Sequence, residues 1–597
     1  MRVRTLLLAL SCLSALFLRA LPAAAHLAPI LIDGRFDEWQ AVPTLAMDPA
    51  GDGASSGIDF QSVQVANDQD YLFFSFDVTG EIQLDADQQL RLYLDTDLDS
   101  GTGIPFHGIG ADLCWEFGWR EGTFRTGGIS YDLNHADVGL MAGPTVSNDR
   151  FEIALARDAV PAAGQALFPG GTVRFILRDA TGGGDVFPDS GSLSYTFSAG
   201  AIATESIDLA RDDPAHLRLA TYNIENDGLF AGGAREAALE RLFQAMDADV
   251  FIISEVWGHS AAAVRAKVAQ FLPGAWHAVT RDGGNVIVSR YPILQAWAVL
   301  AGHRITAALL DLGADRETDL LVIANHWRSG NADEQRQLEA DAVVAFLRDA
   351  RSPGGVITLP EGTPVILGGD FNLVGWRQQL DTVMTGDIVN EGQFGGDAAP
   401  DWDGTPLALP VTRHPDARAA YTWRSDWSSY YPGLLDFVFY SDSALDLRNH
   451  YILDTRTMTA LSLANAGLWA QDTPLGSDHA PRVADFHLIS APSPVPGAAP
   501  ARVATLLPNH PNPFNPATTL RFELAAAARC RLEVLDVRGA RIRELTAGEY
   551  PAGVSHVVWD GRDDAGRGVA SGVYRARLVV DTPFGPEVWS RPMLLLQ

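Results

Sequence analysis

The chain has 597 residues, 47% of them hydrophobic, which is enough for roughly three or four domains with packed cores. Its formal net charge is −30 at pH 7. A surface this acidic repels polyanions at long range and argues against a tight, non-specific nucleic-acid binder, although a divalent cation can still bring a phosphate ester to an acidic enzyme.

Residues 1–25 predict a secretory signal peptide. Arg2 and Arg4 precede an apolar run, and the small residues Ala23 to Ala25 offer a cleavage site. A buried first helix is the weaker alternative. No later stretch reaches the roughly 20 apolar residues that span a bilayer, so we expect a secreted or cell-surface protein.

The cysteine count predicts no disulfide framework. Cys12 lies in the leader, and Cys114 and Cys530 are far apart in the sequence. We expect two buried thiols and no thiolate cluster with zinc spacing. The domains therefore depend on their own apolar cores.

Short apolar or alternating runs separated by turn residues predict an all-β sandwich over residues 27–200. Its opening, ILIDGRFDEW at residues 30–39, resembles the start of the family 9 carbohydrate-binding modules and of DOMON-like sandwiches. The resemblance implies carbohydrate as a partner of this segment. The apolar or alternating runs that predict the strands of this sandwich are residues 71–78, 90–97, 173–180 and 193–198.

The stretch DTDLDSGTG places three acidic residues, Asp95, Asp97 and Asp99, at alternate positions before Gly101. Oxygen-rich calcium loops have this spacing. An ordinary acidic hairpin turn is the stronger alternative, because the distal bidentate glutamate of a full calcium loop is absent.

Residues 215–490 alternate strand-like apolar runs with amphipathic helices. In the helix expected over residues 234–246, Leu239, Leu242 and Phe243 lie on one face. Helices that cover β sheets make a layered α/β domain, which we expect here.

Polar residues stand at or just beyond the ends of these apolar runs. One such residue is typical of any exposed strand end, but packed strands would bring the whole set to one rim. The set is Asn223 after LATY, Glu255 after VFIIS, His326 after LLVIAN, Asp370 and Asn372 around VILGGDFN, Asp436 before FVFY, and Asp478 and His479 before the last strand.

These residue types suit hydrolysis of a phosphate ester. Mg²⁺ prefers carboxylate and amide oxygens together with waters, and it can polarise a phosphoryl oxygen. A carboxylate–histidine pair can orient and deprotonate water. No serine or cysteine nucleophile arrangement and no phosphate-cradling P-loop is apparent in the sequence, so we expect direct attack by water.

In order along the chain, TYNIEN, SEV, GNVIVSRYPI, ANHWRSG, GGDFN, LLDFVFY and GSDHAP resemble the motifs of the endonuclease/exonuclease/phosphatase superfamily. The resemblance covers about residues 215–490. It implies the deoxyribonuclease-I-like fold, a four-layer α/β sandwich with two central β sheets.

The resemblance also implies a metal site. Glu255 would be the main ligand of Mg²⁺, or of Mn²⁺ or Ca²⁺ in its place, with Asn223 and Asp478 contributing. Ser254 stands where a glutamine or asparagine usually precedes the metal-binding glutamate, a departure that leaves the ligand itself in place.

The remaining roles implied by the resemblance concern water and phosphate. Asp370 and Asn372 would position the water and steady the phosphoryl group. His479, with its ring oriented by Asp436, would act on the attacking water. His326 would hydrogen-bond a non-bridging phosphate oxygen or assist the leaving group.

The sequence leaves the substrate open. An extracellular nuclease is the first hypothesis, a sphingomyelinase-like phospholipid phosphodiesterase or a phosphatase the second, and a non-enzymatic surface binding protein the third. Aromatic residues and arginines mix in the loop-rich stretch between Asp370 and Asp436. They could stack bases and contact phosphates, cap the core, or touch a membrane interface. We expect a monomer.

Residues 491–502 are rich in proline and alanine and predict a semi-rigid linker. Residues 503–597 predict a small Ig-like β sandwich. They resemble the FlgD-like Ig module that doubles as the sorting domain of type IX secretion cargo. The resemblance implies the secretion machinery as a partner, and a plain Ig spacer is the alternative.

Overall fold

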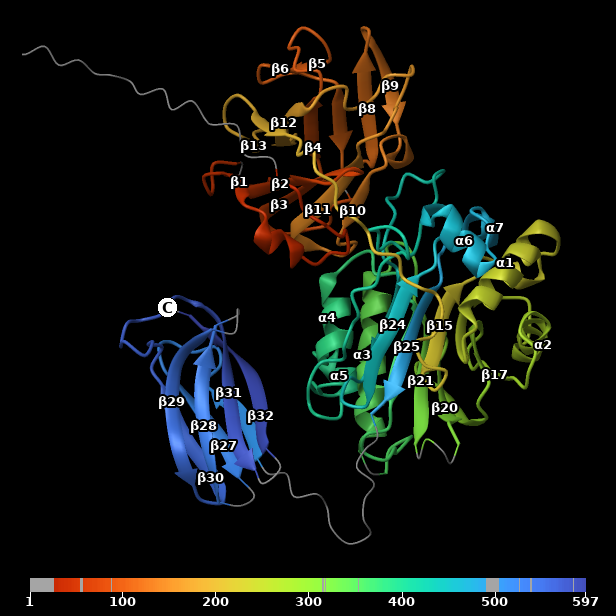
Figure 1. Ribbon diagram of the computed structural model, residues 1–597, viewed down its shortest axis with the longest axis vertical. Helices are drawn as coiled ribbons and strands as arrows, with labels where there is room; N and C mark the ends of the chain where they lie inside the picture. The colour runs from red at the N-terminus through yellow and green to blue at the C-terminus, as the bar shows by residue number, and fades with distance from the viewer. Residues whose placement is uncertain are drawn as a thin grey trace, which may run out of the picture. The chain divides into compact units, whose positions relative to one another are not determined.

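A computed structural model describes most of the chain. The predicted signal peptide and the linker at 491–502 lie outside the described residues. The chain forms two compact units, one ending at Ala491 and the other beginning at Pro492 (Figure 1). The described residues are 26–489 and 504–596, without 54–56, 87, 314, 315, 317, 353, 525, 526, 537–539, 583 and 584.

The first unit opens with a β sandwich of two antiparallel sheets, which confirms the predicted fold of this segment. One sheet has the order β1-β2-β3-β11-β10, and the other has the order β13-β12-β4-β7-β8-β9 with β14 beside β12. The side chains of Phe74, Trp115 and Phe175 fill the space between the sheets and are fully buried. The strands are β1 (Thr44–Met47), β2 (Phe60–Asn67), β3 (Tyr71–Ile82), β4 (Leu90–Asp95), β7 (Leu113–Glu116), β8 (Glu121–Thr126), β9 (Ile129–Leu133), β10 (Met141–Gly143), β11 (Asn148–Ala156), β12 (Thr172–Asp179), β13 (Val186–Phe187) and β14 (Leu193–Thr196), with a small hairpin of β5 (Ile104–Phe106) and β6 (Ile109–Ala111).

The central domain follows in the same unit and contains two further sheets. Their orders are β17-β18-β16-β15-β25-β24 and β19-β20-β21-β22-β23. The strands are β15 (Leu217–Asn223), β16 (Val250–Val256), β17 (His277–Val279), β18 (Gly284–Ser289), β19 (Ile293–Ala298), β20 (Ile305–Asp311), β21 (Asp319–His326), β22 (Val365–Asp370), β23 (Asp436–Tyr440), β24 (Leu445–Ile452) and β25 (Arg482–Leu488).

Helices cover the outer faces of these two sheets. Phe243 of α1 (Gly233–Met246) stacks on Phe251 of β16, with 4.8 Å between ring centroids. Phe346 of α3 (Asp333–Ala350) lies edge-on to Trp297 of β19 at 6.1 Å. Apolar side chains such as Ile252 fill the space between the sheets. Three apolar cores therefore separate four layers, as predicted. The other helices are α2 (Ala261–Phe271), α4 (Arg377–Thr385), α5 (Glu391–Phe394), α6 (Ala460–Ala466) and α7 (Asp472–Gly476).

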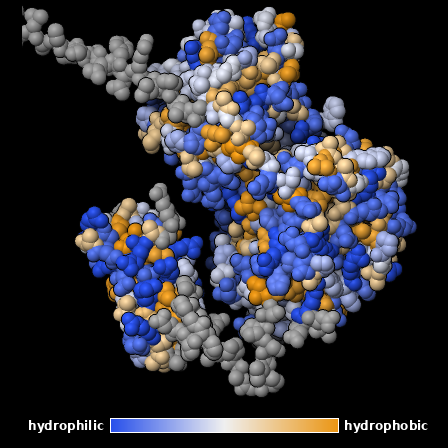
Figure 2. Space-filling view, in the orientation of Figure 1, coloured by the Kyte–Doolittle hydropathy of each residue, from blue (hydrophilic) through white to orange (hydrophobic). Residues whose placement is uncertain are grey.

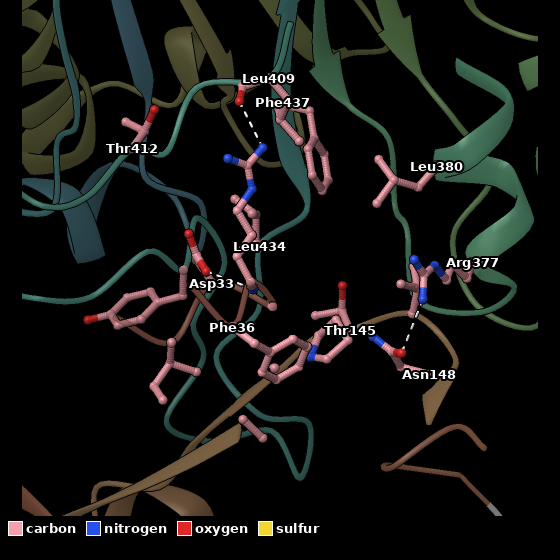
Figure 3. A pocket seen from close by; sticks show the side chains of 18 of the residues that line it. Asp33, Phe36, Thr145, Asn148, Arg377, Leu380, Leu409, Thr412, Leu434 and Phe437 are labelled. Carbon is pink, nitrogen blue, oxygen red and sulfur yellow. Dashed lines mark hydrogen bonds between the residues drawn. The ribbon is translucent and has the colours of Figure 1, made fainter. Parts of the chain in front are cut away.

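A cavity of about 410 Å³ lies where the sandwich meets the central domain (Figure 3). The sandwich contributes Asp33 and Asn148, and the Arg377 guanidinium of the central domain donates to the Asn148 side chain at 3.2 Å. Burial raises the pKa of the Asp33 carboxyl to about 6. Polar and apolar contacts thus join the two domains along this seam.

The second unit is a small antiparallel β sandwich, which confirms the predicted Ig-like fold. Phe522, Leu532 and Trp559 are fully buried in its core. Its sheets have the orders β26-β27-β30 and β29-β28-β31-β32. The strands are β26 (Ala504–His510), β27 (Thr518–Leu524), β28 (Ala528–Leu535), β29 (Arg541–Tyr550), β30 (Gly553–Trp559), β31 (Gly572–Thr582) and β32 (Gly585–Leu595).

Cys114 and Cys530 are 7% and 3% exposed, which confirms the prediction of two buried thiols. Within the described ranges, no helix combines the length and the apolar character needed to cross a bilayer. The visible surface mixes many hydrophilic residues with smaller apolar groups, as expected for an acidic chain (Figure 2).

Candidate active site

Strand directions bring the predicted polar residues to one edge of the two central sheets. β15 and β16 run parallel, and so do β21 and β22, so the carboxyl ends within each pair lie together. β23 and β25 run antiparallel to β22 and β15, which places their first residues at that same edge. The register pairs Asp370 with both His326 and Asp436.

Six of the eight predicted residues line one cleft of about 510 Å³. The other two, Asn223 and Asp436, are 0% and 1% exposed and are hydrogen-bonded to residues of the cleft. The structure thus brings all eight together. The six that line the cleft are Glu255, His326, Asp370, Asn372, Asp478 and His479.

A chain of hydrogen bonds joins the two sheets at this edge. His479 donates from Nδ1 to Asp436 at 2.7 Å, which leaves its Nε2 atom 3.3 Å from the amide nitrogen of Asn223. That amide nitrogen also donates to Glu255 and to Asp370, both at 3.0 Å. The Asn223 side chain therefore holds two carboxylates and an imidazole from different strands.

The surroundings of the two histidines in the cleft shift their pKa values in opposite directions. Burial disfavours the imidazolium of His479, but the charges of Asp436, Asp370 and Asp478 raise its pKa to about 10. Burial lowers the pKa of His326 to about 4. The Nδ1 atom of His326 lies 3.3 Å from the carbonyl of Gly284, so the neutral ring donates there and keeps a lone pair on Nε2.

The backbone is unusual at two of these positions. Glu255 has φ +62° and Asn372 has φ +45°, conformations that non-glycine residues rarely adopt. The pairing of β16 with β18 is irregular between Ser254 and Val256, on either side of Glu255. Such conformations persist where surrounding contacts fix them, and they are common at functional sites.

The oxygen donors of the cleft fit a hard divalent cation. Glu255 and Asp478 supply carboxylates, and Mg²⁺ commonly uses one or two carboxylates together with waters. Asp478 also accepts a hydrogen bond from the Trp423 indole at 2.8 Å. The amide oxygen of Asn223 accepts from the backbone N–H of Glu225, so its nitrogen faces Glu255.

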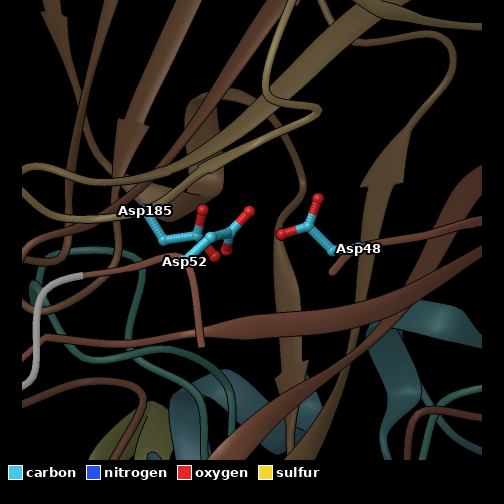
Figure 4. A group of neighbouring side chains, drawn as sticks. All are labelled: Asp48, Asp52 and Asp185. Atoms are coloured by element: carbon cyan, nitrogen blue, oxygen red, sulfur yellow. The ribbon is translucent and has the colours of Figure 1, made fainter. Parts of the chain in front are cut away.

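Two other acidic groups lie in the sandwich. Asp48, Asp52 and Asp185 converge in one of them (Figure 4). Burial and the charges of Asp185 and Asp52 raise the pKa of Asp48 to about 7. Among the residues that the structure describes, nothing else points to a ligand at this group.

The second acidic group contains Asp95 and Asp97 of the predicted calcium loop, joined by Asp112 in place of Asp99. The hydroxyl of Thr102 and backbone N–H groups bond to Asp97 and Asp99 within the loop, as in a turn. Calcium binding there stays a prediction.

The sequence contains no signal for the residues that surround the predicted set. Trp257 lies against the His326 ring, with 5.4 Å between centroids. Trp119 and Arg120 line the cleft from the sandwich. No sequence pattern connects a turn near residue 119 with motifs that begin about a hundred residues later, because only the packing of the two domains brings them together.

Comparisons with known families agree with this geometry. Residues 220–479 match the model of the Endonuclease/Exonuclease/phosphatase family, and residues 512–583 match that of the FlgD Ig-like domain. The first match thus covers nearly all of the central domain. The identity of the N-terminal sandwich as a carbohydrate-binding or DOMON-like module stays a prediction. A search of curated proteins finds no match.

Several solved structures resemble the central region. Humanized D. rerio TDP2 with 14 mutations is 15% identical over 46% of this chain and 99% of its own, with a TM-score of 0.29. SmcL is 14% identical over 46% and 100%, with a TM-score of 0.29. ANGEL2, a 2′,3′-cyclic phosphatase, is 17% identical over 46% and 96%, with a TM-score of 0.32. At these identities and scores the similarity has no bearing on the substrate of this chain.

Proposed function

We propose that this protein is a secreted, divalent-metal-dependent phosphodiesterase that acts on nucleic acid by direct attack of water. The proposal rests on one observation, the hydrogen-bonded chain from Asp436 through His479 and Asn223 to Glu255 and Asp370. This hydrogen-bonded chain supports the proposal that a base, a metal-binding carboxylate and a phosphate-binding edge lie beside one another. The match of the domain to a phosphoesterase family supports the assignment.

Glu255 and Asp478 would hold Mg²⁺, and Mn²⁺ or Ca²⁺ could take its place. Asn223 would join as the amide ligand once its side chain turns so that the oxygen, instead of the nitrogen, faces the ion. When bound, the cation supplies Lewis-acid polarisation of a phosphoryl oxygen. The pKa of His479 falls when positive charge is added beside Asp478, because like charge disfavours the imidazolium. The imidazole can then accept a proton at neutral pH.

His479 would accept a proton from water at Nε2, while Asp436 fixes the ring through Nδ1 and stabilises the cation that forms. Asp370, whose Oδ2 atom is 3.9 Å from that Nε2, would position the same water. Asn372 would donate to the phosphoryl group. His326 is neutral in the free protein, and it would donate to a phosphate oxygen once the anionic substrate favours its protonation.

A hydrolysis screen tests this function. The purified mature chain is incubated with Mg²⁺, Mn²⁺ or Ca²⁺ and with single-stranded DNA, duplex DNA, RNA, bis(p-nitrophenyl) phosphate or sphingomyelin. We expect hydrolysis of the nucleic acids and of the generic diester, with complete loss in EDTA and recovery when the metal is restored.

His479→Ala should lower kcat by at least about 100-fold with unchanged circular dichroism, since general-base catalysis contributes roughly 100- to 10,000-fold. His487→Ala is the matched control, because His487 is an exposed residue of β25 outside the cleft. Undiminished hydrolysis by the His479 variant would refute the assigned role.

A phospholipid phosphodiesterase is the second candidate, favoured by the exposed aromatic residues near the cleft. Trp427 is 98% exposed and lies three residues before Tyr430, which lines the cleft. Indole rings favour the boundary between water and lipid head groups. Cleavage of sphingomyelin in vesicles without cleavage of nucleic acid would select this candidate. Cleavage of neither, with metal binding intact, would favour a non-enzymatic binding protein.

We propose export from the predicted signal peptide at residues 1–25 and from the FlgD Ig-like match, with the secretion machinery as partner of residues 503–597. Deletion of residues 503–597 should keep the protein inside the producing cell, whereas the full chain should be found at the surface or in the medium. Carbohydrate binding by residues 27–200 is tested by affinity electrophoresis in polysaccharide gels.

A further inference from the structure

The cleft that contains the catalytic residues has a wall built by the β sandwich. Residues 83–86 and 118–120 of the sandwich line it together with Glu255, His326 and His479 of the central domain. A substrate whose phosphate lies against the two histidines therefore extends toward sandwich residues.

The turn at residues 118–120 connects β7 to β8 and has a tightly constrained backbone. The N–H of Arg120 donates to the carbonyl of Phe117 at 3.0 Å and closes the turn. A Cβ atom on Gly118 would lie 2.1 Å from the carbonyl oxygen of Gln88, so only glycine fits. Trp119 stands between these two residues, and the turn fixes its backbone at the edge of the cleft.

A tyrosine of the central domain anchors this wall. Tyr431 is 8% exposed and belongs to the sandwich core. Its hydroxyl accepts from the Trp115 indole at 3.0 Å and donates to the Phe117 carbonyl at 2.8 Å. Phe117 immediately precedes the turn, so the contact ties the turn to the central domain.

The neighbouring Tyr430 stands in the cleft. The Arg120 guanidinium lies 4.2 Å from the centre of the Tyr430 ring, a cation–π contact across the two domains. Tyr430 remains 50% exposed and Trp119 66% exposed. Two aromatic side chains, one from each domain, thus present open ring surface in a cleft lined by acidic groups and histidines.

Exposed ring surface beside a phosphate-binding centre fits a planar base, because every nucleobase has a face that stacks on an aromatic side chain. The cleft of about 510 Å³ is in the usual range of small-ligand sites, roughly 300–1,000 Å³. A chain with a net charge of −30 repels a duplex, which is a polyanion, at long range. These features favour an unpaired nucleotide.

We propose that the β sandwich is part of the substrate site and that Trp119 stacks on an unpaired nucleobase of the ester hydrolysed at His479. The inference rests on the proposed phosphodiesterase function. It makes the sandwich a determinant of specificity in addition to any carbohydrate that it binds.

Steady-state kinetics with three p-nitrophenyl phosphodiesters test the inference on the full mature chain. The esters carry thymidine, the same deoxyribose without its base, or a methyl group. We expect wild type to prefer the thymidine ester over the abasic one by about 10-fold in kcat/KM, in line with the stacking of one base. Trp119→Ala should remove this preference through KM, and Trp119→Phe should retain most of it.

Trp469→Ala is the matched control, because Trp469 is 64% exposed and does not line the cleft. Since Trp119 is similarly exposed, neither alanine variant should change the melting temperature by more than about 2 °C. The Trp469→Ala variant and the melting temperatures together distinguish a loss of substrate binding from a loss of folding.

Each other outcome overturns the inference. If Trp119→Ala lowered kcat/KM equally for the thymidine ester and the abasic ester, the indole would bind the sugar and not the base. Lost hydrolysis of sphingomyelin with unchanged thymidine kinetics would show that it binds a membrane. Unchanged kinetics on all substrates would remove Trp119 from the site while leaving the phosphodiesterase function intact, whereas no hydrolysis of any ester by wild type would refute the proposed function itself.

Discussion

Tyr431→Phe removes a single oxygen atom from the contact between the sandwich and the central domain. That oxygen accepts from the Trp115 indole and donates to the Phe117 carbonyl, and both partners are fully buried. A buried polar group left without a partner costs about 1–3 kcal/mol. The Phe117 carbonyl keeps its bond from the Arg120 N–H, so only the Trp115 indole loses its partner. With an unchanged aromatic ring, we expect a loss of about 1–3 kcal/mol.

Urea denaturation of the mature chain, followed by tryptophan fluorescence and far-UV circular dichroism, measures this loss as a shift of the midpoint at constant m-value. Tyr430→Phe is the matched control, because Tyr430 is half exposed, and we expect a change within about 0.5 kcal/mol. The Tyr431 variant should also raise KM for nucleotide esters, since the turn that carries Trp119 is released. A stability loss below about 0.5 kcal/mol would refute the reasoning that this hydroxyl joins the two domains.

Three further predictions follow from single contacts. Asp436→Asn should lower kcat by at least about 100-fold with native circular dichroism, because the His479 ring loses the charge that orients and stabilises it; retained activity would contradict this. Asp48 has a pKa raised from 3.8 to about 7, so the native state keeps a proton that the unfolded chain has released, and stability falls as pH rises between these values. Asp48→Asn should therefore reduce the fall in melting temperature between pH 4 and pH 7.5, and an unchanged pH profile would contradict the shift. Asp485→Asn breaks a buried bidentate pair with Arg218, formed at 2.6 and 2.7 Å, and should cost about 3–5 kcal/mol in denaturant titrations, whereas Asp446→Asn at an exposed pair should cost less than about 1 kcal/mol.

The order of layers in the central domain could be predicted because its signals are local. The spacing of Leu239, Leu242 and Phe243 places them on one face of α1, and the structure buries all three against the first sheet. Apolar runs such as VILGG form strands that are buried on both faces. Such strands carry no alternation, so their polar end residues stand out in the sequence.

The sequence could predict that the eight polar residues lie at one edge, but not how they contact one another. That Asn223 and Asp370 are hydrogen-bonded across two different sheets depends on how the sheets pack, and periodicity within one strand contains no such information. The left-handed backbone of Glu255 was equally invisible, since glutamate has no preference for that conformation. The orientation of the Asn223 amide depends on its neighbours alone.

The sandwich wall of the cleft could not be predicted, for a physical reason. Changes in composition along the chain indicate where one domain ends and the next begins. They do not show that a side chain of one domain can fill the hydrophobic core of another. Tyr431 does this in the sandwich, and its hydroxyl accepts from the Trp115 indole and donates to the Phe117 carbonyl.

An enzyme domain with the sandwich removed would expose Tyr431, and a sandwich without the enzyme domain would leave the Trp115 indole without the Tyr431 hydroxyl. The two segments must therefore fold and be inherited together if the cleft is to keep its shape. The proposed phosphate-binding edge comes from β15, β16, β21 and β22, and the aromatic wall comes from the β7–β8 turn. Substitutions in that turn should therefore change the preferred ester without altering the proposed hydrolytic residues. Substitutions of Trp119 should then change KM for some substrates more than for others, whereas substitutions of His479 should lower kcat for all of them.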